Sequence, residues 1–130
     1  MATSISGKRV AFLATDGVEE VEYTQPRKAV EEAGGTAELV SIKDGEIQAV
    51  NHLDKAGTYP VDKQVKDVAA TDYDALVLPG GQINPDKLRL EPKAIEIIRS
   101  FLDSGKVVAA ICHAPWLLIE AGAVKGPGHV

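Results

Sequence analysis

Residues 74–115 read DALVLPGGQINPDKLRLEPKAIEIIRSFLDSGKVVAAICHAP, a stretch in which two apolar runs flank a helical pattern. It begins with the apolar run DALVL, which has the length of a buried strand and passes directly into a Pro-Gly-Gly turn. A helix start at Pro92 is followed by apolar residues at helical spacing until Gly105. The next apolar run, KVVAAI, predicts a second strand and leads into Cys112.

The same alternation precedes this stretch. Lys8 to Ala14 is a nearly continuous apolar run, typical of a strand buried on both faces. A predicted helix over residues 18–35 has Pro26 in an early turn and ends in two glycines, and Thr36 to Ile42 predicts the next strand. Alternating strands and helices predict an α/β fold with a doubly wound, mainly parallel sheet and helices on both faces, in which ligands bind at the carboxyl ends of the strands.

The segments between these two parts are predicted to be short. Glu46 to Val50 predicts a β segment after a turn, and Tyr59 to Val61 predicts another edge piece. Val65 to Ala70 predicts a short helix. Beyond Cys112, residues 116–122 (WLLIEAG) predict a helix that ends at a glycine.

The bulk composition limits the class of protein. The chain has 130 residues, the size of one ordinary domain, and no window approaches the roughly 18 consecutive apolar residues of a membrane span. A net charge of -5 without a run of Lys and Arg disfavours nucleic acid as the primary partner. The one cysteine cannot form an internal disulfide and suits a reducing compartment. Because acidic residues directly follow the first apolar run, in place of the small residues of a signal sequence, we expect a cytoplasmic protein.

Cys112 lies between a predicted strand and a predicted helix, with alanines two positions away on either side. A sharp strand-turn-helix elbow needs such small neighbours, and the helix-start amides beside its middle side chain favour a thiolate. We therefore predict a catalytic or redox-reactive thiol; the competing interpretation is a buried structural cysteine. His113 is a candidate general acid or base, although a side chain at a helix start can equally point elsewhere.

Two further groups follow predicted strands. Gly80 and Gly81 lack side chains, so their backbone can approach a reacting carbonyl closely enough to form an oxyanion hole; the alternative is an ordinary turn. Glu19, Glu20 and Glu22 follow the first strand, where a buried, protonated carboxyl group can hydrogen-bond a thiolate and transfer a proton. The alternative for these three residues is a surface acidic turn at a helix start.

No metal site or nucleotide site is predicted. His52 and His129 have no ligand partner at metal-site spacing, and one cysteine with three scattered histidines does not make a zinc site. The phosphate-binding patterns GxGxxG and GxxxxGKS/T do not occur.

Three segments resemble, in order, the PfpI/ThiJ family of intracellular proteases, glyoxalases and deglycases: VAFLATDGVEEVEYTQPRKAVEEAGG, YDALVLPGGQINPDKLRL and GKVVAAICHAPWLLIEAG. The resemblance implies a flavodoxin-like sandwich, a homodimer or higher oligomer, a cysteine nucleophile and no cofactor. It also implies that Cys112 is the nucleophile, His113 its adjacent histidine and Glu22 the carboxylate that contacts the thiol.

Other positions match the family less directly. Glu19 resembles a second acidic residue near that site, and Asp86 falls where some members place an acidic residue that completes the site across a subunit interface. His113-Ala114-Pro115 replaces the more usual His-Gly-Pro. Family members continue with further β structure and a last helix, whereas this sequence stops at GPGHV, so we expect the single domain of residues 1–130 to lack the family's C-terminal elements.

The resemblance implies a cysteine-dependent stress-response enzyme that acts on small reactive aldehydes, such as methylglyoxal, or on their protein adducts. Peptide hydrolysis is the second enzymatic possibility, and no residue chooses among these substrates. From another class, the protein is a redox sensor or chaperone-like stress protein in which Glu22 stabilises an oxidised Cys112. A noncatalytic scaffold is a further alternative.

Overall fold

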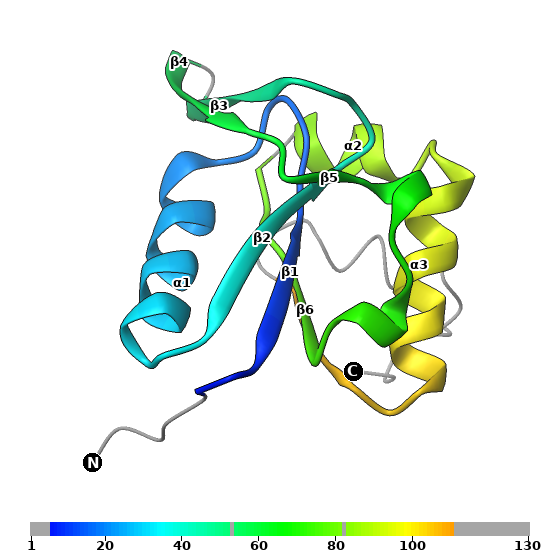
Figure 1. Cartoon of the computed structure of the whole chain (residues 1–130). Coiled ribbons are helices and arrows are strands. Elements are labelled where there is room, and N and C mark those ends of the chain that lie inside the picture. The colour runs from blue at the N-terminus through cyan, green and yellow to red at the C-terminus, as the bar shows by residue number, and fades with distance from the viewer. Residues whose placement is uncertain (1–5, 53, 82, 111–130) are drawn as a thin grey trace, which may run out of the picture.

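A computed structural model describes residues 6–52, 54–81 and 83–110 of the chain. Its centre is a sheet in the order β5-β2-β1-β6-β7, in which every neighbouring pair is parallel (Figure 1). The strands are β1 (Arg9–Leu13), β2 (Thr36–Ser41), β5 (Lys63–Gln64), β6 (Ala75–Leu78) and β7 (Val107–Ala110). The strands predicted on either side of the first helix and before and after the Pro92 helix are confirmed.

Helices lie on both faces of this sheet, so the predicted doubly wound α/β fold of flavodoxin-like type is confirmed. Figure 1 shows α1 (Glu20–Glu32) on one side and α3 (Pro92–Asp103) on the other. α2 (Ile83–Leu88), which the sequence pattern did not predict, follows the Pro-Gly-Gly turn. None of the described helices combines the length and the apolar character needed to cross a membrane.

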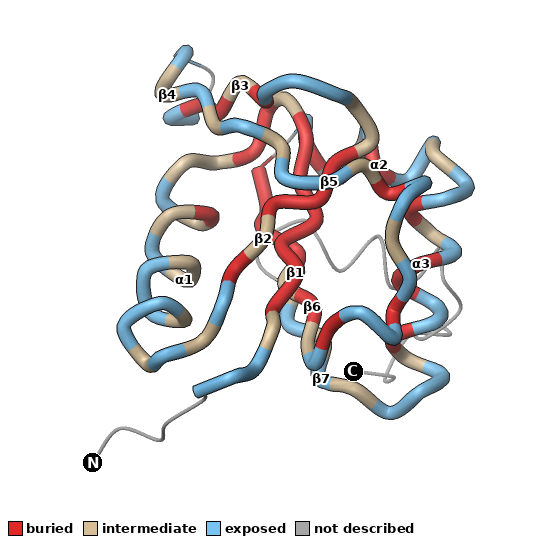
Figure 2. The backbone as a smooth tube through the Cα atoms, viewed as in Figure 1, coloured by how far each residue is buried: buried red, intermediate tan, exposed pale blue. Residues whose placement is uncertain are grey.

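Two apolar clusters hold the layers together, because successive side chains of a strand point to opposite faces. On the α1 face, Phe12 is fully buried and makes an edge-to-face contact with Tyr23, with the ring centroids 5.8 Å apart. On the α3 face, Leu13 belongs to a cluster with Ile98 and Phe101 of that helix. Figure 2 shows β1 buried along most of its length between these clusters.

A small antiparallel hairpin covers the start of α1. It consists of β3 (Glu46–Asn51) and β4 (Asp54–Pro60), so the predicted β segment at residues 46–50 is confirmed. The predicted edge piece at residues 59–61 overlaps only the end of β4. This hairpin forms its own two-stranded sheet rather than extending the central one.

The prediction of one short helix over residues 65–70 is wrong. The chain forms two separate 3-10 turns, Val65–Asp67 and Ala70–Asp72, with extended backbone at Val68 and Ala69 between them. Val65 and Ala70 both enter the cluster on the α3 face. Val65 and Ala70 are therefore buried by two separate turns, and their spacing does not reflect one face of a helix.

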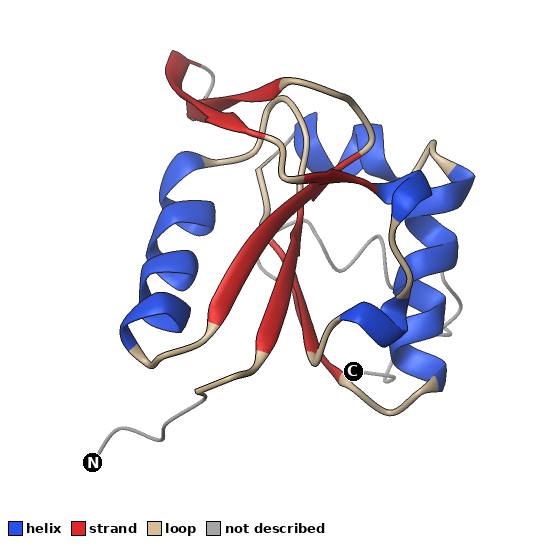
Figure 3. Ribbon diagram, in the orientation of Figure 1, coloured by secondary structure: helices blue, strands red, loops and turns tan. Residues whose placement is uncertain are grey.

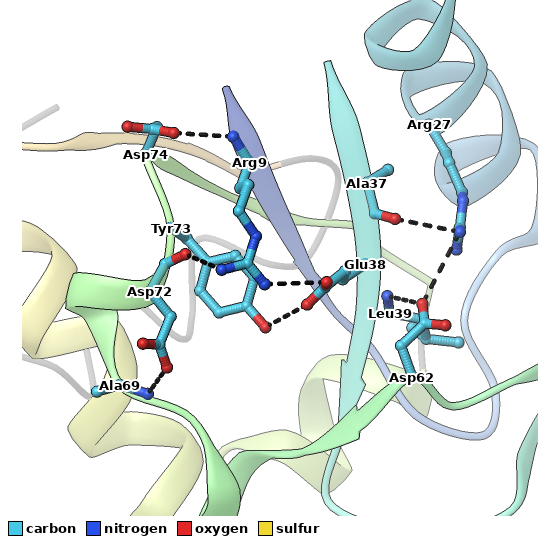
Figure 4. Close-up of polar contacts among 10 residues, drawn as sticks. All are labelled: Arg9, Arg27, Ala37, Glu38, Leu39, Asp62, Ala69, Asp72, Tyr73 and Asp74. Carbon is cyan, nitrogen blue, oxygen red and sulfur yellow. Dashed lines mark hydrogen bonds and ion pairs between the residues drawn. The ribbon is translucent and has the colours of Figure 1, made fainter. Parts of the chain in front are cut away.

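A polar network ties the amino ends of the strands together (Figure 4). Glu38 accepts hydrogen bonds from the Tyr73 hydroxyl at 2.8 Å and from Arg9 Nη2 at 2.9 Å. The Arg9 Nη1 donates to the carbonyl of Asp72, and its backbone N–H donates to Asp74, each at 2.8 Å. Burial opposes ionisation of Glu38, but the hydrogen bonds from Tyr73 and Arg9 outweigh it and lower the pKa of Glu38.

Replacing Glu38 with Gln is expected to lower the free energy of unfolding by about 1 kcal/mol at pH 7, because a charged acceptor is lost from a partly solvated pair. Since the folded state lowers the pKa of Glu38, its carboxylate stabilises the fold above the ordinary value of 4.5, and this contribution disappears as the pH falls through the lower folded-state pKa. Urea unfolding at several pH values measures the difference, which should vanish in acid. Glu32→Gln, at an exposed position of α1, is the control and should show no such trend.

Candidate functional site

The candidate site lies at the carboxyl ends of β1 and β6. These strands are adjacent and parallel, so the segments that follow them, residues 14–18 and residues 79–81, leave the sheet at the same edge. Figure 3 shows these loops at the upper end of the sheet, next to α2. The edge agrees with the one at which the sequence predicted ligand binding.

Glu22 meets the glycine pair directly. It lies in the first turn of α1, and its Oε1 accepts a hydrogen bond of 3.1 Å from the backbone N–H of Gly80. The backbone N–H of Glu19 donates to the carbonyl oxygen of Gly80 at 3.2 Å. Both backbone polar groups of Gly80 are therefore engaged by the segment that begins α1.

Gly81 is required by the closeness of this contact. Its φ is +107°, a conformation that L side chains rarely adopt. A Cβ at this position would lie 2.7 Å from the carbonyl oxygen of Gly17 and 2.9 Å from the backbone nitrogen of Glu19. The second glycine therefore lets one loop lie directly against the other, which an ordinary strand-end turn does not need.

The three glutamates at the start of α1 contact different partners. Glu19 accepts from the backbone N–H of His52 through both oxygens, at 3.1 and 3.0 Å. Glu20 Oε2 accepts from the N–H of Gly57 and from the Tyr59 hydroxyl, both at 2.8 Å. Glu19 and Glu20 thus attach the β3–β4 hairpin to the helix start, and only Glu22 faces the glycine loop.

These contacts alter the titration of the pair on the hairpin side. The hydrogen bond from the Gly57 N–H, followed by that from Tyr59, lowers the pKa of Glu20. Burial, and then the hydrogen bond to Glu20, raise the pKa of Tyr59 to about 12. Around neutral pH the carboxylate is ionised and the phenol is protonated, which suits a fixed structural contact rather than proton transfer.

Asn84, at the start of α2, is the residue that sequence reasoning missed. Its side chain is fully buried, and its Oδ1 accepts from the N–H of Thr15 at 2.7 Å. Its Nδ2 donates to the carbonyl oxygens of Pro79 at 2.9 Å and Gly80 at 3.4 Å. The only sequence signal was an amide side chain soon after a Pro-Gly-Gly turn, a place where Asn ordinarily serves the turn itself.

The remaining predicted site residues are described in part or not at all. Cys112 and His113 lie outside the described residues, and of Asp86 the structure describes the backbone in α2 but not the side chain. β7 runs beside β6, with Ala110 opposite Leu78, so its last described residue lies level with the end of β6. Among the described residues no group of three or more His, Cys, Asp or Glu side chains is arranged to hold a metal ion.

The described part of the site combines a carboxylate, a glycine loop and a buried amide at one edge of the sheet. The carboxylate can accept or donate a proton, depending on its protonation state. Because the Gly80 N–H donates to Glu22, the oxyanion-hole role predicted for this glycine pair is left to the backbone of Gly81. Such a set suits acid–base chemistry beside a polar reacting atom.

Known proteins match this chain over most of its length. The model of the DJ-1/PfpI family matches residues 8–129. General stress protein 18 of Bacillus subtilis is 39% identical over 120 residues, which cover 92% of this chain and 68% of that protein. Protein/nucleic acid deglycase 2 of Escherichia coli is 37% identical over 119 residues, which cover 92% of this chain and 67% of that protein.

Among solved structures, a two-domain protein from Anabaena variabilis with DJ-1/ThiJ/PfpI-like and ferritin-like domains superposes with a TM-score of 0.84 at 29% identity. The superposition covers 92% of this chain but only 33% of that larger protein. The fold, the order of its segments and the match of the family model over residues 8–129 agree, and the chain belongs to the DJ-1/PfpI family.

Proposed function

We propose that this chain is a cysteine-dependent enzyme that acts on small reactive aldehydes or on the adducts they leave on proteins. The observation that carries the proposal is the hydrogen bond between Glu22 and the Gly80 N–H, which holds a carboxyl group just beyond the end of β6, the strand that pairs with β7. The similarity to a relative named as a deglycase supports the reaction class. Cys112 follows β7 in the sequence, and we propose that its thiol faces Glu22.

In the proposed reaction with methylglyoxal, the Cys112 thiolate attacks the aldehyde carbon, a C–S bond forms, and the π electron pair moves to oxygen. We assign the stabilisation of that oxygen to the amides of Gly81 and His113, because the Gly80 amide already donates to Glu22. Glu22 then moves the proton from the former aldehyde carbon to the neighbouring ketone carbon. The first oxygen re-forms a carbonyl and the former ketone oxygen takes a proton from solvent, which leaves a lactoyl thioester. Water cleaves the thioester to lactate and free thiol, so the net change is the addition of one water molecule.

Two other functions use the same thiol. Peptide hydrolysis would proceed through an acyl-thioester on Cys112, and no described residue discriminates between peptides and aldehydes. The name General stress protein 18 supports only a stress-related role. As the alternative class we propose a redox sensor, in which peroxide oxidises the Cys112 thiol to a sulfenic acid and is itself reduced to water. We also propose that the chain forms a homodimer or a higher homo-oligomer, which light scattering in solution tests.

Incubation with methylglyoxal, followed by measurement of lactate, tests the proposed enzyme. Cys112→Ala is expected to reduce lactate formation to background, and Glu22→Gln to lower kcat/KM at least about 100-fold through the loss of acid–base catalysis. The matched control is Glu32→Gln, which removes an exposed carboxylate from the same helix and should leave the rate unchanged. Equal, background-level lactate from the unmodified protein and Cys112→Ala would contradict the reaction with free aldehyde. Release of glyoxal adducts from a glycated peptide would then test the protein adducts as the substrate.

Mild peroxide treatment followed by intact-mass measurement tests the redox sensor. Because the chain has one cysteine, the sensor predicts a stepwise gain of oxygen that is absent from Cys112→Ala. Glu22→Gln should lower the yield of the first oxidised product if this carboxyl group stabilises it. Oxygen uptake that is equal in Cys112→Ala would show that methionine or another residue is the target and would rule the sensor out.

The close approach of the two loops is tested by Gly81→Ala. The new Cβ would collide with the Gly17 carbonyl and the Glu19 amide, in addition to the strain of a positive φ, so we expect a loss of about 2–3 kcal/mol in the free energy of unfolding. Gly45→Ala is the matched control, because Gly45 also has a positive φ of +83° but has no atom within 4 Å of the added Cβ. Urea unfolding of both variants should show Gly81→Ala as the more destabilised; equal losses would contradict the close approach.

A further inference from the structure

Asn84 is a buried polar side chain whose contacts all go to the backbone of the candidate site. It is 0% exposed, and its amide makes one hydrogen bond as acceptor and two as donor. Burial of an amide is unfavourable unless its polar atoms are paired, and within the described part of the chain no buried side-chain nitrogen or oxygen lacks a partner. The three hydrogen bonds of Asn84 therefore pair the polar atoms of its buried amide, which offsets the free-energy cost of burying them.

The hydrogen bonds of Asn84 connect two segments that lie beyond the ends of β1 and β6. β1 ends at Leu13 and β6 at Leu78, so the ladder between them stops before Thr15 and Gly80. Asn84 reaches Thr15 on one side and Pro79 and Gly80 on the other, and so continues the connection past the strand ends. A single side chain from α2 thus contacts both loops, in addition to the direct contacts that Gly80 makes with Glu19 and Glu22.

Gly80 contacts both Asn84 and Glu22, the proposed acid–base residue. Its carbonyl oxygen is approached by Asn84 Nδ2 and by the N–H of Glu19, whereas its own N–H donates to Glu22. A shift of Gly80 would therefore change its contact with the Glu22 carboxylate. Asn84 is thus connected to Glu22 through Gly80, which makes one hydrogen bond with each of them.

We propose that Asn84 is a positioning residue, which holds Gly80 so that its N–H meets the carboxylate of Glu22. The consequence for turnover rests on the proposed function of Glu22, but the contact itself does not. Asn84 touches no reacting atom in this proposal. It acts by fixing the geometry of the loop after β6 against the loop after β1.

The test follows the Gly80 amide directly, by NMR of the labelled full chain. In the unmodified protein, the Gly80 resonance should shift as Glu22 is protonated, and this shift should be absent in Glu22→Gln. In Asn84→Ala the shift should fall to less than half, and hydrogen exchange at Gly80 should accelerate at least tenfold relative to the amides of β1. A Gly80 amide that shifts and exchanges as in the unmodified protein would overturn the proposal.

Ile98→Ala is the matched control for loss of stability. Ile98 is fully buried in α3, on the opposite face of the sheet from α1, and its truncation weakens the core without removing a hydrogen bond between the two loops. In this variant exchange should accelerate at Gly80 and in β1 alike, while the pH-dependent shift of Gly80 stays unchanged. If Asn84→Ala behaves in the same way as Ile98→Ala, Asn84 is only a core residue and the proposal is wrong.

Asn84→Asp keeps the test decisive if Asn84→Ala does not fold. The introduced carboxyl group can accept from Thr15 in either form, but only its protonated form can also donate to the carbonyl of Pro79 or Gly80. Protection of the Gly80 amide, relative to β1, should therefore resemble that of the unmodified protein in acid and fall as the introduced group ionises. Protection that does not depend on that ionisation would contradict the proposal.

Measurements of turnover distinguish the positioning role of Asn84 from the proposed catalytic role of Glu22. If Glu22 and Asn84 act together, Asn84→Ala lowers kcat with methylglyoxal, and adding it to Glu22→Gln produces less than the product of the two single effects. If Glu22→Gln is fully active, the proposed function is wrong, and the Gly80 measurements still decide whether Asn84 positions the loop. Independent, multiplicative effects of the two changes on kcat would overturn the claim that Asn84 acts on turnover through Glu22.

Discussion

The parallel pairing of β1 with β6 positions both loops of the candidate site. Each strand is covered on both faces, by α1 and the hairpin on one side and by α3 on the other, so neither strand can shift without exposing core residues. Parallel strands end at the same edge of a sheet, which brings the segments after Leu13 and Leu78 together. Every contact of the candidate site described above lies in or next to these two segments.

The turn that begins α1 shows how one residue type serves several purposes. Glu19 and Glu20 hold the hairpin through backbone N–H groups, and Glu22, less than one helical turn further on, reaches the loop after β6. Glu20 and Glu22 are two apart on the helix and lie on different sides of it, whereas Glu19 is the N-cap residue with extended backbone, so the three carboxylates reach different partners. Each of the three carboxylates accepts a hydrogen bond from another segment, although all three residues stay partly exposed at the helix start.

Elements that depend on neighbouring residues could be predicted from the sequence, whereas elements that depend on contacts with distant residues could not. The strands ending at Leu13 and Leu78 and the helix beginning at Pro92 could be predicted, because apolar runs and helix-start residues act within a few positions. The two turns around Val68 and the short helix α2 could not, because their apolar residues are placed by contact with α3 and not by their own periodicity. Asn84 escaped detection because a lone amide has no pattern until its partners are known.

From the sequence alone, the fold class, the alternation of the main strands and helices, and the glycine pair and glutamates as candidates for the site could be predicted. Only the tertiary structure decided that Glu22 contacts Gly80 across 58 positions and that Asn84 contacts Thr15 across 69. The physical reason is that a hydrogen bond needs its atoms within about 3 Å, and the strand order that brings such distant residues together is set by burial of the whole sheet. Local propensity holds no information about that distance.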